Sequence, residues 1–396
     1  SRQIALNGYK IYTYQDKSKQ DALEKSFDNS NINCDNAGIV IDNKKHSIVA
    51  YIGDSIYKIL DSKRQPGSCI KPILVYGPAL NEDIIYPCTQ LLDEKTTISD
   101  YTPKNVNNVY RGYVSAREAL SKSINIPAVK VLSYVGIDKA KNYAEDMGIE
   151  FDELDDSYSL ALGGMTYGTN ILQLAGAYST FANNGNYSKP KSISFITDKN
   201  NRLVYINKSH EVNVMREDCA YLLTDMLKTC ATTGTAKKLA QLNIDIASKT
   251  GTVGKPNSKS NLDAWNVSYT KDYTCGVWLG NLDNSPINYA GGNQPTEIVK
   301  NYFTIVGDNS HFNIPSSIVN RKIDRTELDE NHRIVLANGF IPERYIQEET
   351  FSIFNLPKDI SNKFSTIEKP ILTSKVEGNK AIIEFEAKDY ITYTAL

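Results

Sequence analysis

Strand-like runs lie on both sides of a long helix-rich stretch, and this order constrains the fold more than any other feature of the sequence. Two β-branched runs, residues 37–41 and 47–52, flank a polar turn and predict a hairpin. Apolar residues recur at helical spacing through the middle of the chain, in residues 114–122, 127–134, 139–147, 170–183 and 216–229. Strand-like runs return after this stretch, and the last two predict an antiparallel hairpin: residues 244–249, 264–269 and 273–279. The simplest arrangement is an α/β fold of the α+β type, in which one antiparallel sheet is built from both parts of the chain and flanked by helices.

The two ends of the chain depart from this pattern. Near the start, the sequence predicts a short strand at residues 11–14 and a helix at residues 20–27. Beyond about residue 311 the periodicity weakens, although residues 381–385 and 390–393 look like strands of a small β module. We therefore expect one main domain with a short segment before it and an extension after it.

Composition excludes some classes of function. Lys plus Arg total 44 and Asp plus Glu total 46, so we expect no nucleic-acid partner. The chain has six Cys without a C-x-x-C pair and four scattered His, so we expect no metal site and no cofactor. No apolar run approaches the 18 residues of a membrane span, and any membrane anchor is expected upstream of Ser1.

Three short motifs follow one another along the chain and together carry chemistry. They are Ser68-Cys69-Ile70-Lys71, Ser123-Ile124-Asn125 and Lys249-Thr250-Gly251-Thr252. S-x-x-K occurs four times, but only the copy at Ser68 has a suitable setting upstream of the other two motifs. The set supplies a hydroxyl nucleophile, proton carriers and an anion-binding strand, which acyl transfer through a serine ester requires.

Ser68 is the candidate nucleophile, and Lys71 is its candidate base. If Ser68 opens a helix, the two side chains share one face and can meet. Lys71 can act only as the neutral amine, and lowering a lysine pKa from about 10.4 to about 7 costs roughly 4–5 kcal/mol. Burial and a second cation, for which Lys249 is the candidate, both shift the pKa in this direction. Cys69 points about 100° away from this face and is interpreted as a packing residue, and Pro72 predicts a local distortion of the helix.

The second motif offers a proton relay and an amide. Ser123 and Asn125 share one side if the segment is an extended loop, which the following Ile126-Pro127 favours. Ser123 could then pass a proton between Lys71 and a leaving amine, and Asn125 could bind a substrate amide. The structural alternative is that Asn125 is merely a helix C-cap.

The third motif continues a strand, so that Thr250 and Thr252 share a face and can bind a carboxylate through their hydroxyls. Gly251 would let a substrate backbone approach closely. The backbone N–H groups of Ser68 and Thr252 are candidates for an oxyanion hole, in which one donor contributes roughly 3–4 kcal/mol. The alternative for this motif is an ordinary edge strand that enters a loop.

The motifs and their flanks resemble those of penicillin-binding proteins. Residues 64–72 look like the nucleophile motif of that family, residues 117–129 resemble its second motif, and Lys249 to Thr252 followed by Asp263-Ala264-Trp265 is similar to its third. Stretches between the second and third motifs also match, at residues 161–164 and 175–185. Cys69-Ile70 departs from the Thr-Phe that is more usual in the family.

Two segments resemble the class A, bifunctional branch of the family. Residues 8–13 look like the linker strand that follows a glycosyltransferase domain, and residues 101–105 resemble a class A segment between the first two motifs. The resemblance implies a linker at residues 1–35, a transpeptidase domain with the penicillin-binding-protein/serine β-lactamase-like fold at residues 36–310, and an extension, partly β, at residues 311–396.

This resemblance also implies a D,D-transpeptidase that cross-links peptidoglycan stem peptides through a Ser68 acyl-enzyme at the outer face of the bacterial cell membrane. Its partners would be a D-Ala-D-Ala donor peptide, an amine acceptor and β-lactam inhibitors, and a glycosyltransferase domain with the membrane anchor would precede this chain.

Three other functions share parts of this chemistry. A class A β-lactamase would carry an E-x-x-x-N segment, which residues 145–168 lack, and the Asp of S-D-N, where this chain has Ile124. A D,D-carboxypeptidase would differ only in using water as the acceptor. A non-catalytic β-lactam sensor belongs to a different class, and the class A linker at residues 8–13 argues against it.

Overall fold

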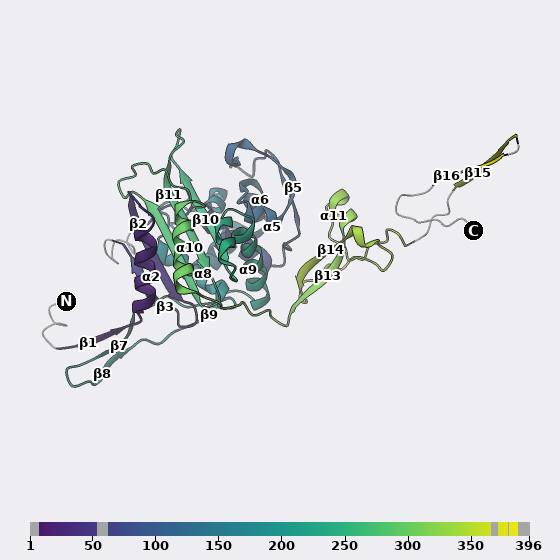
Figure 1. The fold of residues 1–396 in the computed structure, drawn as a ribbon. Helices are drawn as coiled ribbons and strands as arrows, with labels where there is room; N and C mark the ends of the chain where they lie inside the picture. Colours follow the sequence, from purple (N-terminus) through teal and green to yellow (C-terminus); the bar gives the residue numbers. More distant parts are fainter. Residues whose placement is uncertain (1–7, 54–61, 366–370, 379, 387–396) are drawn as a thin grey trace. The chain divides into compact units, whose positions relative to one another are not determined.

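The central sheet joins strands from both sides of the helix-rich stretch, as the sequence predicts. In the computed structural model, which describes residues 8–53, 62–365, 371–378 and 380–386, five strands pair in the order β10-β11-β12-β2-β3 (Figure 1). Every neighbouring pair is antiparallel. The strands are β2 (Asp35–Asp42), β3 (Ser47–Ile52), β10 (Ala247–Gly254), β11 (Asn261–Tyr269) and β12 (Tyr273–Gly280).

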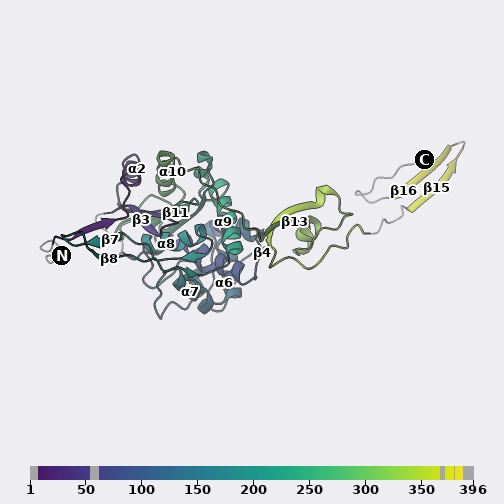
Figure 2. The ribbon, with the colours of Figure 1, turned by 90° about the horizontal axis from the view of Figure 1, so that it is seen from below.

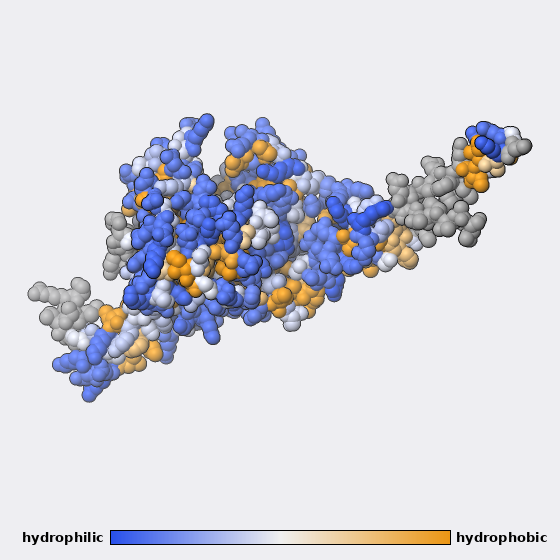
Figure 3. Space-filling view, viewed as in Figure 1, coloured by the Kyte–Doolittle hydropathy of each residue, from blue (hydrophilic) through white to orange (hydrophobic). Residues whose placement is uncertain are grey.

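Helices cover both faces of this sheet. Figure 2 shows α2 (Lys17–Asp28) and α10 (Gln294–Val306) on one side, and α8 (Ile171–Ala182) among the helices on the other. Alternation along the strands explains the two faces, since Ile39 belongs to the core on the α8 side and its neighbour Val40 to the core under α2 and α10. Both faces are therefore buried, and mostly hydrophilic side chains lie on the outer surface of α2 and α10 (Figure 3).

The helices of the middle stretch agree with the predicted ones, with small differences at their ends. The structure contains α5 (Ala116–Ser121), α6 (Asn125–Val135), α7 (Ile137–Asp146), α8 and α9 (Glu217–Thr232), with the short η4 (Tyr158–Leu162) before α8 and η5 (Lys237–Leu242) after α9. The helix predicted from residue 114 begins later because β5 (Gly112–Ser115) pairs with β4 (Gln90–Asp93). The strand predicted from residue 244 begins at Ala247, after Asn243 has ended η5 in a left-handed conformation.

The N-terminal segment forms the predicted strand and helix. Strand β1 (Lys10–Thr13) pairs with β7 (Ile193–Thr197), which pairs with β8 (Leu203–Ile206) in a small separate sheet. Helix α2 is longer than predicted because the Asp16 carboxylate accepts from the N–H groups of Ser18 and Lys19 and so caps its first turn. In the chain, β6 (Asn186–Tyr187) precedes β7 and β9 (Val212–Asn213) follows β8, and these two strands pair with each other.

The chain divides into two compact units, Ser1–Ile318 and Val319–Leu396, close to the expected domain end at residue 310. The second unit contains α11 (Arg325–Asn331), η6 (Glu343–Tyr345), β14 (Ile346–Ser352) and all but the first residue of its partner β13 (Ile318–Asp324). The weak periodicity did not predict these elements. A hairpin of β15 (Ile371–Glu377) and β16 (Lys380–Glu386) contains the strand predicted at residues 381–385. The other predicted strand, residues 390–393, lies outside the described residues.

Among the described helices, none combines the length and the apolar composition that crossing a bilayer requires.

Candidate active site

The helical segment that carries Ser68 changes its winding twice. It begins as the 3-10 turn η1 (Gly67–Ile70), continues as the π-helical turn η2 (Pro72–Tyr76) and ends as α4 (Gly77–Asn81). Pro72 has no N–H, so the carbonyl of Ser68 accepts from the Lys71 N–H, and the Pro72 carbonyl accepts from the Gly77 N–H. The distortion expected at Pro72 is thus present. In a 3-10 turn residues three apart are stacked, which places Ser68 and Lys71 on one face.

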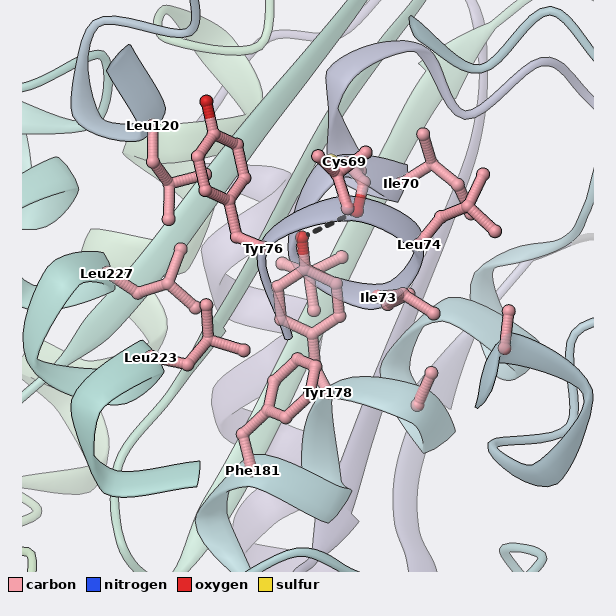
Figure 4. Packing of buried hydrophobic residues seen from close by; sticks show 14 of the residues in the cluster. Cys69, Ile70, Ile73, Leu74, Tyr76, Leu120, Tyr178, Phe181, Leu223 and Leu227 are labelled. Carbon is pink, nitrogen blue, oxygen red and sulfur yellow. Dashed lines mark hydrogen bonds between the residues drawn. The ribbon is translucent and has the colours of Figure 1, made fainter. Parts of the chain in front are cut away.

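The buried side of this segment packs against an apolar cluster. Figure 4 shows Ile73, Leu74 and Tyr76 of η2 packed with side chains of α8 and α9. The hydroxyl of Tyr178 on α8 donates to the Cys69 carbonyl at 2.7 Å. Packing and this buried hydrogen bond thus help to hold the nucleophile segment in place.

Cys69 lies on the buried side of this segment, as predicted. Its side chain is fully buried, and its Sγ contacts the Lys249 carbonyl at 3.5 Å. Burial raises the pKa of the Cys69 thiol to about 12, and it raises that of the nearby Cys230 to about 11. Both thiols are protonated at neutral pH, so neither is a competing nucleophile or an anion beside the lysines.

Lys71 is completely buried and has only uncharged partners. Its Nζ donates to the Ser123 carbonyl at 2.9 Å, the Ile124 carbonyl at 3.1 Å and Asn125 Oδ1 at 2.9 Å, and it lies 3.4 Å from Ser123 Oγ. Burial, together with the charge of Lys249, holds the pKa of Lys71 well below its ordinary value. These two effects favour the neutral amine that a proton acceptor requires, whereas the three acceptors match the N–H groups of the ammonium form.

Lys249 reaches the same hydroxyl from the sheet. Its Nζ donates to Ser123 Oγ at 2.9 Å and to the Thr250 carbonyl at 3.0 Å. Burial lowers the pKa of Lys249 too. Two buried amines that share one hydroxyl disfavour a second positive charge, so the site favours only one protonated lysine at a time. Ser123 Oγ lies between the two.

The second motif has a different backbone from the predicted extended loop. Ser123 is left-handed, with φ of 57°, and Asn125 is the first residue of α6. Asn125 is also not a C-cap, because Lys122 ends α5. A helix can start here despite Pro127, since a proline in the first turn removes only an N–H that has no acceptor within the helix. Asn125 nevertheless faces Lys71, as the motif requires.

The hydroxyls of the third motif are both engaged. Thr250 Oγ1 donates to Thr235 Oγ1 at 2.7 Å, and Thr252 Oγ1 accepts from the Gly291 N–H at 3.0 Å. Strand β10 is an edge strand of the sheet, paired with β11 alone. Thr252 remains exposed, so its hydroxyl is accessible to a ligand.

Gly251 packs closely against the nucleophile segment, and its contact with a substrate backbone stays a prediction. A Cβ at this position would lie 2.4 Å from the Pro66 carbonyl oxygen and 3.0 Å from Cys69 Sγ. The space in which a side chain at Gly251 would lie is thus filled by the nucleophile segment of the protein itself. This close packing also brings the main chains of Gly67 and Thr252 together, with the Gly67 Cβ position 3.2 Å from the Thr252 nitrogen. The candidate oxyanion donors, the N–H groups of Ser68 and Thr252, therefore belong to adjoining segments.

The residues that fix the chain before Ser68 were not predicted from the sequence. Arg64 Nε donates to Asp263 Oδ1 at 2.7 Å, and Trp278 Nε1 donates to the same oxygen at 3.0 Å. Trp265 Nε1 donates to the Gln65 carbonyl at 2.9 Å. The only signal for these roles was the position of Asp263 and Trp265 just after the third motif.

No cluster of three or more His, Cys, Asp or Glu side chains that could hold a metal ion occurs within the part of the chain that the structure describes. The residues around Ser68 are a hydroxyl, two amines, an amide and threonines, which are not metal ligands of the usual kind.

Comparison with known proteins decides the family. The family described as "Penicillin binding protein transpeptidase domain" matches residues 37–304. The chain belongs to this family. This confirms the resemblance and the fold class predicted from the motifs.

Curated relatives within the penicillin-binding proteins are considerably longer than this chain. Penicillin-binding protein 1F of Bacillus subtilis is 36% identical over 296 residues, which cover 72% of this chain and 41% of the relative. Penicillin-binding protein 1A/1B of the same organism is 30% identical over 404 residues, covering 94% of this chain and 43% of the relative. The chain thus spans about four tenths of the length of these relatives.

Solved structures of penicillin-binding proteins have the same fold. PonA1 of Mycobacterium tuberculosis, in complex with penicillin V, aligns with a TM-score of 0.69 at 22% identity, over 79% of this chain and 90% of that one. Penicillin-binding protein 1A of Haemophilus influenzae aligns with a TM-score of 0.70 at 23% identity, over 83% of this chain and 54% of that one.

Proposed function

We propose that this chain is the D,D-transpeptidase part of a class A penicillin-binding protein, and that it cross-links peptidoglycan stem peptides through an ester on Ser68. The observation that carries the proposal is the hydroxyl of Ser123, which lies within reach of both Lys71 and Lys249 beside the helical turn of Ser68. Two further observations support it: the chain belongs to the transpeptidase family, and PonA1, which shares its fold, forms a complex with penicillin V.

Acylation would start with neutral Lys71. It takes the proton of the Ser68 hydroxyl as Oγ bonds to the carbonyl carbon between the two terminal D-alanines of the donor peptide. The oxygen of that carbonyl gains negative charge and is stabilised by the N–H groups of Ser68 and Thr252. When the C–N bond breaks, the proton passes from Lys71 through Ser123 to the departing amine of D-alanine. Lys249 stays charged and orients Ser123 throughout.

Deacylation would use the same groups in reverse. An amine of a neighbouring stem peptide attacks the ester, gives its proton to Lys71 and restores the Ser68 hydroxyl. The exposed Thr252 and the neighbouring Thr250 would bind the carboxylate of the donor peptide or of a β-lactam. We also propose that the whole protein is anchored upstream of this chain and acts at the outer face of the cell membrane.

Mass spectrometry with a labelled penicillin tests the proposal. The wild-type chain should gain one adduct on the peptide that contains Ser68, and Ser68→Ala should gain none. An adduct on another residue of Ser68→Ala would overturn the assignment. Product analysis with a synthetic D-Ala-D-Ala peptide and an amine acceptor then separates transpeptidation from carboxypeptidase activity, which would yield only the shortened peptide.

A serine β-lactamase is the second candidate because it would share the acylation step. Sustained turnover of nitrocefin would favour it, whereas a transpeptidase should give one slow equivalent of product per protein. A non-catalytic sensor would also take up one penicillin, but it would form no product from the synthetic peptide and the amine.

A further inference from the structure

Helix α6, which begins with Asn125, has no cap of its own. Its N-cap residue is Ile124, whose side chain offers no acceptor for the first N–H groups of the helix. The missing acceptor comes from Asn105, twenty residues earlier in the chain. Asn105 Oδ1 accepts from the N–H groups of Asn125 at 3.1 Å and Ile126 at 3.2 Å.

The amide of Asn105 can take only one orientation. Its Nδ2 donates to Asp93 Oδ1 at 2.6 Å and to the Val109 carbonyl at 2.9 Å. A flipped amide would direct its oxygen at a carboxylate and a carbonyl, and its N–H groups at the N–H groups of the helix. Asp93 is itself completely buried, and its second oxygen accepts from the Arg111 N–H at 3.0 Å.

The same segment holds the side chain of Asn125. Asn125 Nδ2 donates to the Lys104 carbonyl at 2.9 Å, and this bond turns Asn125 Oδ1 toward Lys71, from which it accepts at 2.9 Å. Lys104 and Asn105 thus contact Asn125 at its amide side chain and at its backbone N–H. They lie in the segment that resembles class A proteins, and they take no part in the acylation and deacylation steps proposed for the site.

We infer that Asn105 is a positioning residue of this active site. Its side chain, held by Asp93, caps the first N–H groups of α6 and so fixes Asn125 against Lys71. Asn105 does not itself touch Lys71, and its effect on the reaction passes through Asn125. The inference rests on the proposed function, since it assumes that Lys71 accepts the proton of Ser68.

Loss of this cap should change more than stability. Without Asn105 the first turn of α6 frays, and Asn125 Oδ1 no longer stays opposite the ammonium form of Lys71. The charged form of Lys71 loses an acceptor, so the pH below which acylation declines should move downward. A residue with a purely structural role would lower the melting temperature and leave this pH unchanged.

The test is the acylation rate of the full chain by a fluorescent penicillin from pH 5 to pH 10. Circular dichroism melting ensures that each variant is folded at the temperature used. Asn105→Ala should acylate at least about 10-fold more slowly than the wild type, with its acid limb at lower pH. Val106→Ala is the matched control, because its side chain is 74% exposed and only one position away.

A second pair of variants keeps the inference falsifiable if Asn105→Ala folds poorly. Asn105→Asp should also acylate slowly, because it replaces the amide that donates to Asp93 with a second carboxylate, and the two carboxylates repel each other. The double variant Asp93→Asn/Asn105→Asp restores a donor and an acceptor in the reverse direction and should recover at least about threefold of that loss.

Two results would overturn the inference. One is an Asn105→Ala variant with the wild-type rate and the wild-type pH profile. The other is a loss in every variant that follows the folded fraction alone, without a shift of the acid limb and without recovery in the double variant. Failure of the proposed function would look different, because the wild-type chain itself would then not be acylated at Ser68.

Discussion

Lys249 and Ser123 are 126 residues apart in the sequence, and Nζ of Lys249 donates to Oγ of Ser123 across 2.9 Å. The pair joins an edge strand of the sheet to the turn between α5 and α6. Because Lys71 lies 3.4 Å from the same oxygen, a proton could pass between the nucleophile side and the sheet side of the site through one hydroxyl.

Replacement of Ser123 tests this relay. Ser123→Ala should slow acylation of Ser68 by about 10²–10⁴-fold, the usual contribution of a positioned proton carrier. Stopped-flow measurement with a chromogenic β-lactam gives the rate. Ser133→Ala is a suitable control, since its hydroxyl donates only to the Lys130 carbonyl within α6. An unchanged rate in Ser123→Ala would exclude the relay.

The lowered pKa of Lys71 predicts a specific pH dependence. Only the neutral amine accepts a proton, so acylation should rise as the pH rises through that pKa, well below 10.5, and fall at lower pH. Between that pKa and about 10.4 the unfolded chain binds more protons, so this lysine makes the fold more stable as the pH rises. Lys71→Arg should abolish acylation because a guanidinium stays protonated. An inflection near 10.4, or an active Lys71→Arg variant, would contradict the assignment.

Gly251 should be intolerant of a side chain for reasons of packing. Its added Cβ would lie 2.4 Å from the Pro66 carbonyl oxygen, so Gly251→Ala should lower the free energy of unfolding by about 1–3 kcal/mol and slow acylation. Urea unfolding measures the first effect. Gly254→Ala in the same strand is the control, because among the described residues, apart from its two chain neighbours, no heavy atom lies within 4 Å of its Cβ position. Equal stability of the two variants would refute this explanation.

The ion pair between Arg64 and Asp263 should be important for stability. Its side chains are only 11% and 3% exposed, so Asp263→Asn leaves a buried guanidinium without its charge partner and should cost about 3 kcal/mol. The exposed pair of Lys17 and Asp21 is the control, and Asp21→Asn should cost less than about 1 kcal/mol. Guanidinium chloride unfolding is unsuitable because salt screens such pairs, so urea is preferable. If the two losses are equal, the buried pair has no special role.

Local patterns were sufficient to predict the central sheet and most of its helices. The strand-like runs in residues 37–52 and 264–279, with the short turns between them, identify two hairpins, and the three-residue spacing of Ser68 and Lys71 identifies a shared helical face. These features depend on neighbours in the chain, which a single sequence contains.

The missed features depend on distant partners. The sequence offers no sign that Asn105 caps α6, since the acceptor and the two N–H groups belong to separate segments. The close packing of Gly251 against Pro66 and Cys69 could not be predicted either, because those residues lie far away in the chain. Asn125 was predicted to lie in a loop because residues just before a proline tend to avoid the helical conformation. That tendency takes no account of a distant side chain, such as Asn105, that caps the helix.

The pairing of β2 with β12 has a consequence for synthesis. Asp35, at the start of β2, accepts from the N–H of Leu282, 247 residues further along. At translation rates of about 5–20 residues per second, roughly 10–50 s pass between the synthesis of the β2–β3 hairpin and that of its partner strand β12. A polypeptide that stops before β12 retains Ser68, Lys71 and Ser123 yet leaves a Val- and Ile-rich strand edge uncovered. Chaperones that cover this exposed strand edge during that interval should therefore raise the yield of folded protein.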